Sequence, residues 1–269
     1  MGGMTDLRPV LTDDANAGLV TLVTGGGTGL GRAIAREFAR TGASLVIAGR
    51  RPEPLEETRA ELEAGGTACL AVPTDVREPD QVQALVDAAL ERFGRIDVLV
   101  NNAGGQFAAP AEQISLKGWR AVHRLNVDAV WDLTRTVATR SMIPNRRGLV
   151  VFIGFSPRRG VPLMIHSAAA RAALENLAGG IAIEWSRYGI RAVCVATGAI
   201  DTPAFRAYGE AFVEEALRTS PLGRLIAPEE VAALIAFLAT PAAASITGTT
   251  IVVDTGNDAW GLGYPPPRD

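Results

Sequence analysis

Short apolar runs alternate along the whole chain with segments whose apolar residues recur at helical spacing. This alternation constrains the fold more than any other feature. The runs are LVTLVT (19–24), SLVIAG (44–49), CLAVPT (69–74), DVLVNN (97–102), LVVFIG (149–154), RAVCVA (191–196) and TIVVD (250–254). Most of them lack polar alternation, as expected for strands buried on both faces. Strand, helix and strand in this order predict a parallel sheet covered by helices on both sides. We therefore expect a single α/β domain built on a doubly wound parallel sheet of about seven strands flanked by helices.

This domain is expected to occupy residues 18–257, because 269 residues with 48% hydrophobic content suffice for one large buried core. Residues 1–17 are polar and predict a flexible N-terminal arm, and the Pro- and Gly-rich residues 258–269 predict an extended tail. The net charge of −3 gives no reason to expect a nucleic-acid partner, and no apolar run reaches the length of a membrane span. Cys69 and Cys194 lie in apolar runs, which predicts buried free thiols and a cytoplasmic location. We expect no metal site.

The first apolar run leads into the glycine-rich stretch TGGGTGLG, residues 24–31, which opens a helix-period segment. Glycines at such a position let the backbone turn tightly and approach a pyrophosphate, which the N–H groups at the helix start can bind. Ligands of doubly wound sheets bind at the carboxyl ends of the strands. The stretch therefore predicts a Rossmann-type dinucleotide site in which the cofactor contacts Gly25, Thr28, Gly29, Leu30 and Gly31.

The loops after the next three runs complete this predicted cofactor site. Arg50 and Arg51 follow the second run, where an acidic residue would bind the ribose 2′-hydroxyl of NAD. A guanidinium suits a 2′-phosphate instead, so NADP(H) is favoured over NAD(H). Asp75, which precedes Val76 after the third run, is placed to accept a hydrogen bond from the adenine amine. The turn after the fourth run is small enough to pass close to the adenine ribose and consists of Asn102, Ala103 and Gly104.

Together these motifs resemble the short-chain dehydrogenase/reductase superfamily over residues 19 to about 256. The resemblance rests on TGGGTGLG, NNAGG, LNVDA, RAVCVATGAIDT, PLGRLIAPEEVA and ITGTTIVVD. Within the superfamily, NNAGGQFAAPAEQISLKGW and HSAAARAALENL are most similar to the 2,4-dienoyl-CoA and trans-2-enoyl-CoA reductases. The resemblance implies an NAD(P)H cofactor and a proton-relay water held by Asn126 beside a kinked helix. It also implies cofactor contacts from Gly198, Ile200 and Thr202, of which Thr202 would bind the nicotinamide amide.

The catalytic tyrosine and lysine of the family are replaced here, because they align with Ser167 and Arg171. Residues four apart share one helix face, so both side chains should still reach the same cleft. In carbonyl reduction, the tyrosine protonates the forming alkoxide and the lysine ammonium lowers the tyrosine pKa. A serine hydroxyl is a far poorer acid. An arginine stays charged and can hold the nicotinamide ribose, but it does not shuttle protons.

Other candidate donors follow from the same comparison. The dienoyl-CoA reductases take a tyrosine from eleven residues upstream of the usual position, and that residue is Ser156 here. Ser156 and Ser167 remain as hydrogen-bond donors to a thioester oxygen. Tyr208, in the segment that covers the substrate in this family, is a possible acid from a lid. His166 is a further possible donor, although neighbouring helix residues point about 100° apart.

The segment HSAAARAALENLAGGIAIEW carries Gly179 and Gly180 in its middle. Two interior glycines cost a helix about 1 kcal/mol each relative to alanine. Close approach of a partner helix explains them, which agrees with the homotetramer or homodimer that the resemblance implies. Access to the substrate cleft is the alternative explanation.

Three functions remain open on the sequence alone. The first is an NADPH-dependent enoyl- or dienoyl-thioester (CoA) reductase with an atypical site, because hydride addition to an activated C=C gives an enolate that water can protonate at carbon. The second is a carbonyl or alcohol oxidoreductase that uses an unorthodox proton donor. The third is a non-catalytic NADP-binding protein that serves as a sensor, scaffold or partner subunit.

Overall fold

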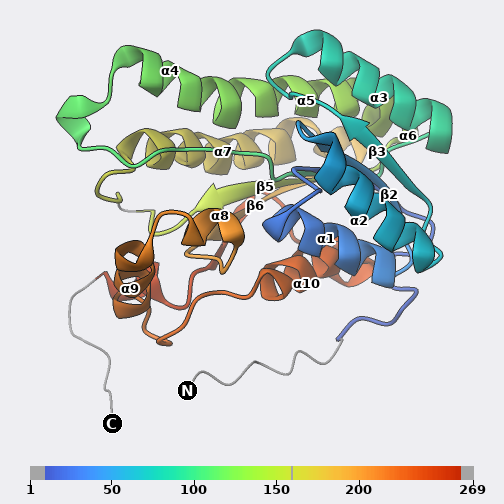
Figure 1. Ribbon diagram of the computed structural model, residues 1–269. Coiled ribbons are helices and arrows are strands. Elements are labelled where there is room, and N and C mark those ends of the chain that lie inside the picture. Colours follow the sequence, from blue (N-terminus) through green and yellow to red (C-terminus); the bar gives the residue numbers. More distant parts are fainter. Residues whose placement is uncertain (1–9, 159, 262–269) are drawn as a thin grey trace.

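Seven parallel strands form one sheet in the order β3-β2-β1-β4-β5-β6-β7 (Figure 1). The computed structural model describes residues 10–158 and 160–261. The strands are β1 (Val20–Thr24), β2 (Ser44–Gly49), β3 (Cys69–Pro73), β4 (Val98–Asn101), β5 (Gly148–Phe155), β6 (Ile190–Thr197) and β7 (Thr249–Val253). Each strand coincides with one of the apolar runs to within one residue at either end. The predicted doubly wound parallel sheet is therefore confirmed.

Helices cover both faces of this sheet. They are α1 (Gly29–Arg40), α2 (Pro52–Ala64), α3 (Pro79–Phe93), α4 (Leu116–His123), α5 (Ala129–Val137), α6 (Ile143–Asn145), α7 (Ile165–Glu184), α8 (Pro203–Arg206), α9 (Glu210–Arg218), α10 (Pro228–Ala239) and α11 (Asn257–Trp260). On one face α1, α2 and α10 bury Phe38 and Ile235 in a common core, and on the other α3, α5 and α7 bury Leu85 and Leu174. Both layers are visible in Figure 1.

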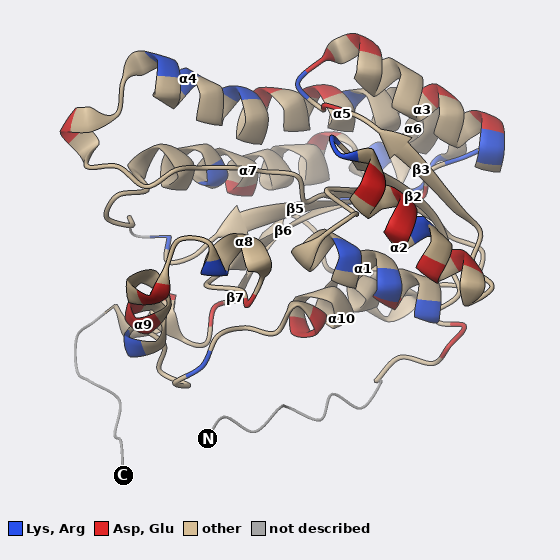
Figure 2. Cartoon of the chain, in the orientation of Figure 1, with Lys and Arg blue, Asp and Glu red and all other residues tan. Residues whose placement is uncertain are grey.

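The direction of the chain through the sheet reverses between β1 and β4, and this fixes where a ligand can bind. From β1 the chain moves outward to β2 and β3, then returns to β4 on the other side of β1 and continues to β7. The loops that leave β1 and β4 diverge at the carboxyl edge, and such a switch point is the usual ligand crevice of a doubly wound sheet. Figure 2 shows that charged residues gather on the outer helices, while the central strands are largely uncharged. The side chains that could bind a ligand must therefore come from the loops and helix starts at the carboxyl edge.

Both ends of the domain extend further than the sequence suggested. Asn16 is 1% exposed, and its side-chain amide donates to Thr41 Oγ1 at 2.9 Å and to Ala236 O at 3.2 Å. The expected loose arm over residues 1–17 is therefore wrong at Asn16, because tertiary hydrogen bonds hold this residue; residues 1–9 lie outside the described part. At the other end, α11 includes Asp258, which is 6% exposed. The tail was expected to start at residue 258, but helix α11 continues to Trp260. Residues 262–269 of the expected tail lie outside the described part.

Candidate active site

The glycine-rich turn between β1 and α1 packs against the loop after β4. Gly25 and Gly29 both have a positive φ, and Gly25 N donates to Ala48 O at 2.7 Å. A Cβ at Gly31 would collide with the Gly25 carbonyl group and lie 2.6 Å from Asn102 Nδ2. Only a glycine at 31 therefore lets helix α1 start this close to the turn, which brings its first N–H groups to the cleft.

Thr24 fixes the second wall of this cleft. Its hydroxyl oxygen accepts hydrogen bonds from the backbone N–H groups of Asn102 and Ala103, at 3.0 and 2.9 Å. The Asn102 side-chain amide donates back to Thr24 O at 2.7 Å. The predicted turn of residues 102–104 is thus held directly beside the glycine-rich turn, as a dinucleotide site requires.

Residues after β6 close the cleft from the other side. The side chain of Thr202 lies 3.4 Å from the position of a Cβ at Gly29, so these two predicted cofactor residues face each other. Thr202 also caps α8, because its hydroxyl oxygen accepts from Phe205 N at 3.2 Å. Gly198 packs against Asp254, and Ile200 forms an isolated parallel β-bridge with Ile226. The arrangement fits a nicotinamide dinucleotide: small residues line a cradle that a Cβ would fill.

Charged residues gather where the adenine end of a dinucleotide would lie. Arg50 and Arg51 are exposed just after β2, and Val76, in the loop after β3, is buried. Asp75 accepts hydrogen bonds from Arg77 N and Nε, at 3.1 and 2.9 Å. The Arg77 guanidinium holds the pKa of Asp75 at about 2. Sequence reasoning missed Arg77, which lies too close to Asp75 along the chain to stand out as a separate signal.

The side chains of Asn126 and Arg171 both lie close to Gly104, in the turn after β4. Asn126 lies in a π-helical segment (Arg124–Asp128) between α4 and α5, where its side-chain amide donates to Gly105 O and Val122 O, both at 2.8 Å. A Cβ at Gly104 would lie 2.8 Å from Asn126 Oδ1 and would collide with the Arg171 guanidinium. The absence of a side chain at 104 thus makes room for Arg171. Ser167 and Arg171 are four residues apart on α7; the first contacts Gln106 and the second lies beside Gly104.

The Arg171 guanidinium is buried and carries no counter-ion among the described residues. Its side chain is 9% exposed, its Nη1 donates to Ile153 O, and its Nε has no hydrogen-bond partner in the described part of the chain. Burial lowers the pKa of Arg171 to about 10, so the group stays protonated at neutral pH. The cleft therefore contains a permanent positive charge that the protein itself does not neutralise.

Ser167 and Tyr208 are linked through Gln106, a residue that sequence reasoning missed. The Ser167 hydroxyl donates to Gln106 Oε1 at 2.8 Å. The Tyr208 hydroxyl donates to the backbone oxygen of the same residue at 3.3 Å. Gln106 lies in the loop between β4 and α4, where no periodic pattern indicates which side chain turns inward. The position of Gln106 directly after NNAGG was the signal available in the sequence.

Ser156 does not join this group, which corrects its expected role as a donor to substrate. Its hydroxyl donates to Asp254 Oδ2, and its side chain is 4% exposed. Ser156 has one proton to donate and gives it to an ionised carboxylate, a stronger acceptor than a neutral carbonyl oxygen, so this proton is not available to a substrate. The contact joins the ends of β5 and β7 and holds them together behind the cleft.

His166 is also unsuited to give a proton. The residue is fully buried, and burial lowers its pKa, so the imidazole is neutral at neutral pH. Its ring lies against Phe107, with ring centroids 4.4 Å apart. Neither ring nitrogen has a hydrogen-bond partner among residues 10–158 and 160–261. His166 therefore packs beside the cleft, and its possible role as an acid is not supported by this geometry.

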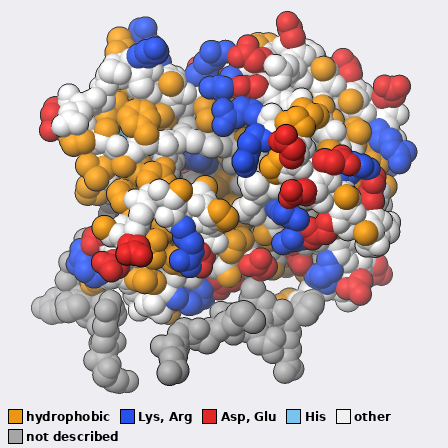
Figure 3. Space-filling model, viewed as in Figure 1, with side chains coloured by type: hydrophobic (Ala, Val, Ile, Leu, Met, Phe, Trp, Pro, Cys, Tyr) orange, Lys and Arg blue, Asp and Glu red, His pale blue; other side chains and the backbone are white. Residues whose placement is uncertain are grey.

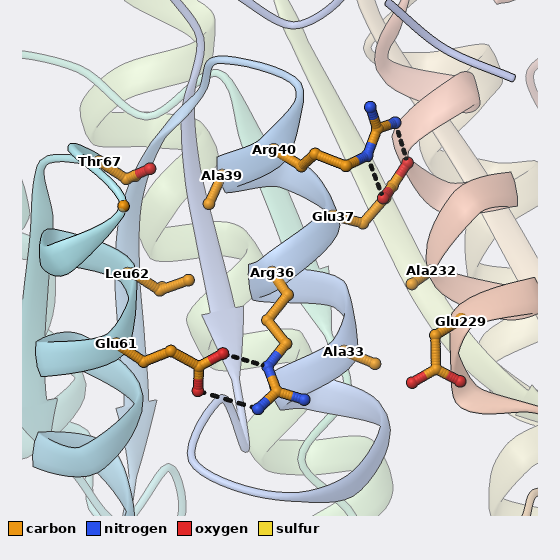
Figure 4. Close-up of a pocket in the computed structure, with 11 residues that line it drawn as sticks. Ala33, Arg36, Glu37, Ala39, Arg40, Glu61, Leu62, Thr67, Glu229 and Ala232 are labelled. Carbon is orange, nitrogen blue, oxygen red and sulfur yellow. Dashed lines mark hydrogen bonds and ion pairs between the residues drawn. The ribbon is translucent and has the colours of Figure 1, made fainter. Parts of the chain in front are cut away.

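A separate cavity of about 380 Å³ lies between α1, α2 and α10 (Figure 4). Four of its five charged lining residues are paired, because Arg36 Nε donates to Glu61 at 2.6 Å and Arg40 Nη2 donates to Glu37 at 2.7 Å; Glu229 is the fifth. None of the predicted site residues lines it. The catalytic geometry belongs to the carboxyl edge of the sheet.

Comparisons with known proteins agree with this geometry. The chain matches the family described as Enoyl-(Acyl carrier protein) reductase over residues 25–258. A probable 2,4-dienoyl-CoA reductase [(2E)-enoyl-CoA-producing] of Bacillus subtilis is 35% identical over 251 residues, which is 91% of this chain and 97% of that protein. The chain belongs to the short-chain dehydrogenase/reductase superfamily.

Two further relatives are similar to this chain over most of its length. A peroxisomal 2,4-dienoyl-CoA reductase [(3E)-enoyl-CoA-producing] of Pongo abelii is 36% identical and covers 91% of this chain and 85% of its own length. The crystal structure of a short-chain dehydrogenase from Bacillus anthracis has a TM-score of 0.84 at 36% identity and covers 90% of this chain and 97% of that one. The superfamily binds NAD(P)(H), and the match spans both the cofactor cleft and the segment with Ser167 and Arg171.

Proposed function

We propose that this chain is an NADPH-dependent reductase of enoyl or dienoyl thioesters, such as those of coenzyme A. The observation that carries the proposal is the buried guanidinium of Arg171, which has no counter-ion among the described residues and lies beside Gly104 and Asn126. An unpaired buried charge is costly, by several kcal/mol per ion in typical proteins. The cost is understandable when the reaction itself brings a negative charge to that place.

Reduction of an α,β-unsaturated thioester creates such a charge. When bound, reduced nicotinamide would supply a hydride to the conjugated chain, and the electron pair of the C=C bond would move onto the thioester oxygen. Arg171 then stabilises the enolate oxygen electrostatically, and the Ser167–Gln106 contact orients the amide that faces the substrate. The enolate is protonated at carbon, so this reaction does not need the acid that a ketone reductase uses to protonate oxygen. The chemistry thus tolerates the loss of the usual tyrosine and lysine.

The preference for NADPH is supported by the tip of β2. Arg50 and Arg51 are both exposed there, in the place where an acid would select NAD. Arg50 also lies near enough to Asp75 to favour its ionised form. A 2′-phosphate bound to Arg50 would gain charge-assisted hydrogen bonds, each worth more than a neutral one.

An apolar acyl chain is supported by the mouth of the cleft. Three large apolar side chains next to Gln106 and His166 in the chain are more than a third exposed: Phe107 at 39%, Leu163 at 38% and Ile165 at 41%. Their segments are joined, because Ala109 N donates to Leu163 O at 3.0 Å. Figure 3 shows hydrophobic side chains gathered on the side of the molecule where α4 and α7 begin. The relatives named above as 2,4-dienoyl-CoA reductases act on chains of this kind.

We also propose that the enzyme is a homodimer or homotetramer that packs through the outer face of α7. A Cβ at Gly179 or Gly180 would meet nothing within 4 Å, so the protomer itself does not require these glycines. Ile183 on the same helix is 79% exposed, and nearby Trp131 is 41% exposed and stacks with Trp185. Light scattering over a range of protein concentrations tests this assembly. A protein that remained monomeric up to about 100 µM would contradict it.

The buried free thiols of Cys69 and Cys194 support a reducing compartment, and we propose the cytoplasm. None of the helices in the described part of the chain has both the length and the apolar character needed to cross a lipid bilayer. Fractionation of cells that express the tagged full chain tests the location. Recovery with organelles would contradict the proposal.

The experiment that tests the activity measures NADPH binding by fluorescence and then NADPH oxidation with crotonyl-CoA, 2,4-hexadienoyl-CoA and a panel of ketones. We expect turnover with the thioesters and none with the ketones. Turnover confined to ketones would indicate a carbonyl reductase. Tight NADPH binding without turnover of any substrate would indicate a non-catalytic protein.

A further inference from the structure

Tyr208 lies in the tight turn between α8 and α9, two short helices that follow β6 in the chain (Figure 1). Its ring packs between Phe205 and Phe212, at centroid distances of 6.5 and 5.3 Å. Its hydroxyl leaves this apolar cluster and donates to Gln106 O at 3.3 Å. The Tyr208 ring is therefore held by contacts within the α8–α9 segment, and its hydroxyl is held by the loop after β4.

Gln106 brings this phenol into the same group as the catalytic face of α7. One end of the residue, its backbone oxygen, accepts from Tyr208, and the other end, its side-chain oxygen, accepts from Ser167 at 2.8 Å. Ser167 stands where the family's proton donor would project. The chain thus links a phenol, through Gln106, to the position from which the family's tyrosine is missing, and this phenol comes from the turn between α8 and α9.

We propose that Tyr208 is the acid that protonates the enolate carbon in thioester reduction. The inference rests on the proposed function and adds to it the proton donor. In this step the enolate oxygen re-forms the thioester carbonyl, and the electron pair of the enolate C=C forms a new C–H bond with the Tyr208 proton. The O–H bond breaks and its electrons remain on the phenolate, which regains a proton from water at the partly exposed cleft.

The alternatives nearby are weaker acids or have no proton to give. Arg171 stays charged, His166 is neutral and buried, and a serine hydroxyl such as Ser167 is less acidic than a phenol. Burial raises the pKa of Tyr208, so its phenol is fully protonated at neutral pH. An enolate carbon is far more basic than a phenolate, so the transfer is downhill even from a phenol of raised pKa.

The first test compares Tyr208→Phe with Tyr188→Phe, which makes the same chemical change beside Trp185 at the far end of α7. With crotonyl-CoA and NADPH, we expect kcat of Tyr208→Phe to fall at least tenfold, because general acids contribute about 10²- to 10⁴-fold. KM and NADPH binding should stay within about threefold of wild type, and Tyr188→Phe should match wild type. In D₂O, wild type should place deuterium on one face of the α carbon, and Tyr208→Phe should place it on both.

A kcat loss of less than tenfold in Tyr208→Phe, with unchanged deuterium stereochemistry, would overturn the role of Tyr208 and leave the reductase proposal standing. No thioester turnover by wild type would instead overturn the reductase proposal itself. The two failures are therefore distinguishable in one set of assays.

A second measurement does not depend on turnover or on the folding of a Tyr208 variant. The wild-type chain is labelled with 3-fluorotyrosine, and the resonances are assigned with Tyr188→Phe and Tyr264→Phe. Addition of butyryl-CoA, the saturated product, should shift the Tyr208 fluorine resonance and leave that of Tyr188 in place. A Tyr208 resonance that does not move at saturating butyryl-CoA would show that the phenol does not contact the acyl group.

Discussion

Two arginine side chains are buried or partly buried at opposite edges of the same sheet, and they differ in how many hydrogen bonds the protein makes to them. Arg191, near the amino end of β6, is partly buried and donates to three backbone oxygens, those of Leu238 at 2.7 Å and of Ala243 and Ile246 at 3.1 Å. Arg171, at the carboxyl edge, donates to one backbone oxygen, and its Nε has no partner among the described residues. Burial lowers the pKa of both groups. The first arginine completes the fold, whereas the second keeps hydrogen-bonding capacity that the fold does not use.

This difference extends to other groups at the two edges. At the amino edge, the buried carboxylate of Asp97 accepts from Val20 N and Arg95 Nε at 2.9 Å and pairs with Arg147 at 3.1 Å. At the carboxyl edge, Gly31 and Gly104 leave gaps that side chains would otherwise fill. At the amino edge the buried charges of Arg191 and Asp97 are satisfied by the fold, whereas unfilled space and an unpaired charge at the carboxyl edge leave room for a ligand. Each prediction below tests whether that division holds.

The sharpest test replaces each arginine with methionine. For Arg171→Met we expect kcat with a thioester to fall about 10²- to 10³-fold, the usual cost of losing one oxyanion-stabilising group. The free energy of unfolding should stay level or rise by about 1–3 kcal/mol, because an unpaired buried charge is removed. For Arg191→Met we expect a loss of about 2–4 kcal/mol, because three carbonyl groups lose their donor, with kcat unchanged in the folded enzyme. Urea unfolding and steady-state kinetics measure both.

If Arg171→Met proved the less stable of the two variants and kept normal kcat, Arg171 would be a structural residue. The contrast between the two edges would then be wrong. Arg171→Lys refines the result, because it retains the charge but shortens the side chain. Partial recovery of kcat would show that charge, rather than the shape of the guanidinium, is what the reaction uses.

The glycine cradle gives the next largest effect. In Gly31→Ala the new methyl group would collide with the Gly25 carbonyl group and with Asn102, so the turn must open. We expect NADPH to bind at least about 100-fold more weakly, because the first N–H groups of α1 then leave the pyrophosphate position. Gly179→Ala is the matched control, because within the protomer its methyl group meets nothing within 4 Å; because Gly179 lies on the proposed subunit face, light scattering first checks that this variant assembles as wild type does. Isothermal titration with NADPH measures both variants; equal affinities would mean that the cleft does not bind the cofactor through this turn.

The cofactor cleft was more predictable from the sequence than the catalytic cleft, and the reason is physical. A glycine-rich turn between a buried strand and a helix has few possible geometries, so Gly25, Gly29 and Gly31 could be placed by pattern alone. The i and i+4 spacing likewise placed Ser167 and Arg171 on one face. Gln106 could not be found in this way, because its direction depends on a long loop that contacts α7 and the turn between α8 and α9 through tertiary interactions.

Ser156 shows the opposite failure, in which a correct position along the chain gave the wrong role. Residues at a strand end alternate between the two faces, so a shift of one residue exchanges the cleft for the interior. The structure turns Ser156 toward Asp254, which directly follows β7 about 100 residues further along the chain, and the local sequence gives no sign of this contact. Asn16 was placed in a loose arm for a similar reason, because its partners Thr41 and Ala236 lie far along the chain.

Cofactor selectivity gives a smaller effect at the same edge. For Arg50→Ala we expect NADPH to bind about tenfold more weakly, which corresponds to the loss of one charge-assisted contact of about 1.4 kcal/mol. NADH affinity should be unchanged, because NADH lacks the 2′-phosphate. Arg187→Ala serves as the control, because Arg187 is also exposed but lies just after the carboxyl end of α7. Equal losses for both cofactors would refute the role of Arg50 in selecting NADPH, and the NADPH affinity of wild type should also fall as salt is raised.

The smallest predicted effect concerns the ion pair between Asp75 and Arg77, which tests whether the adenine end is also held by the fold. The pKa of Asp75 is lowered to about 2 in the folded protein, below the value of 3.8 of a free aspartate. A lowered folded pKa contributes stability above the unfolded pKa, and that contribution is lost as pH falls toward 2. We therefore expect Asp75→Asn to unfold about 1 kcal/mol more easily than wild type at pH 6, with solvent screening included. The difference should shrink as pH falls from 4 toward 3. A difference that stayed constant across this range would mean that the carboxylate charge adds nothing to the fold, and Asp75 would then belong wholly to the ligand.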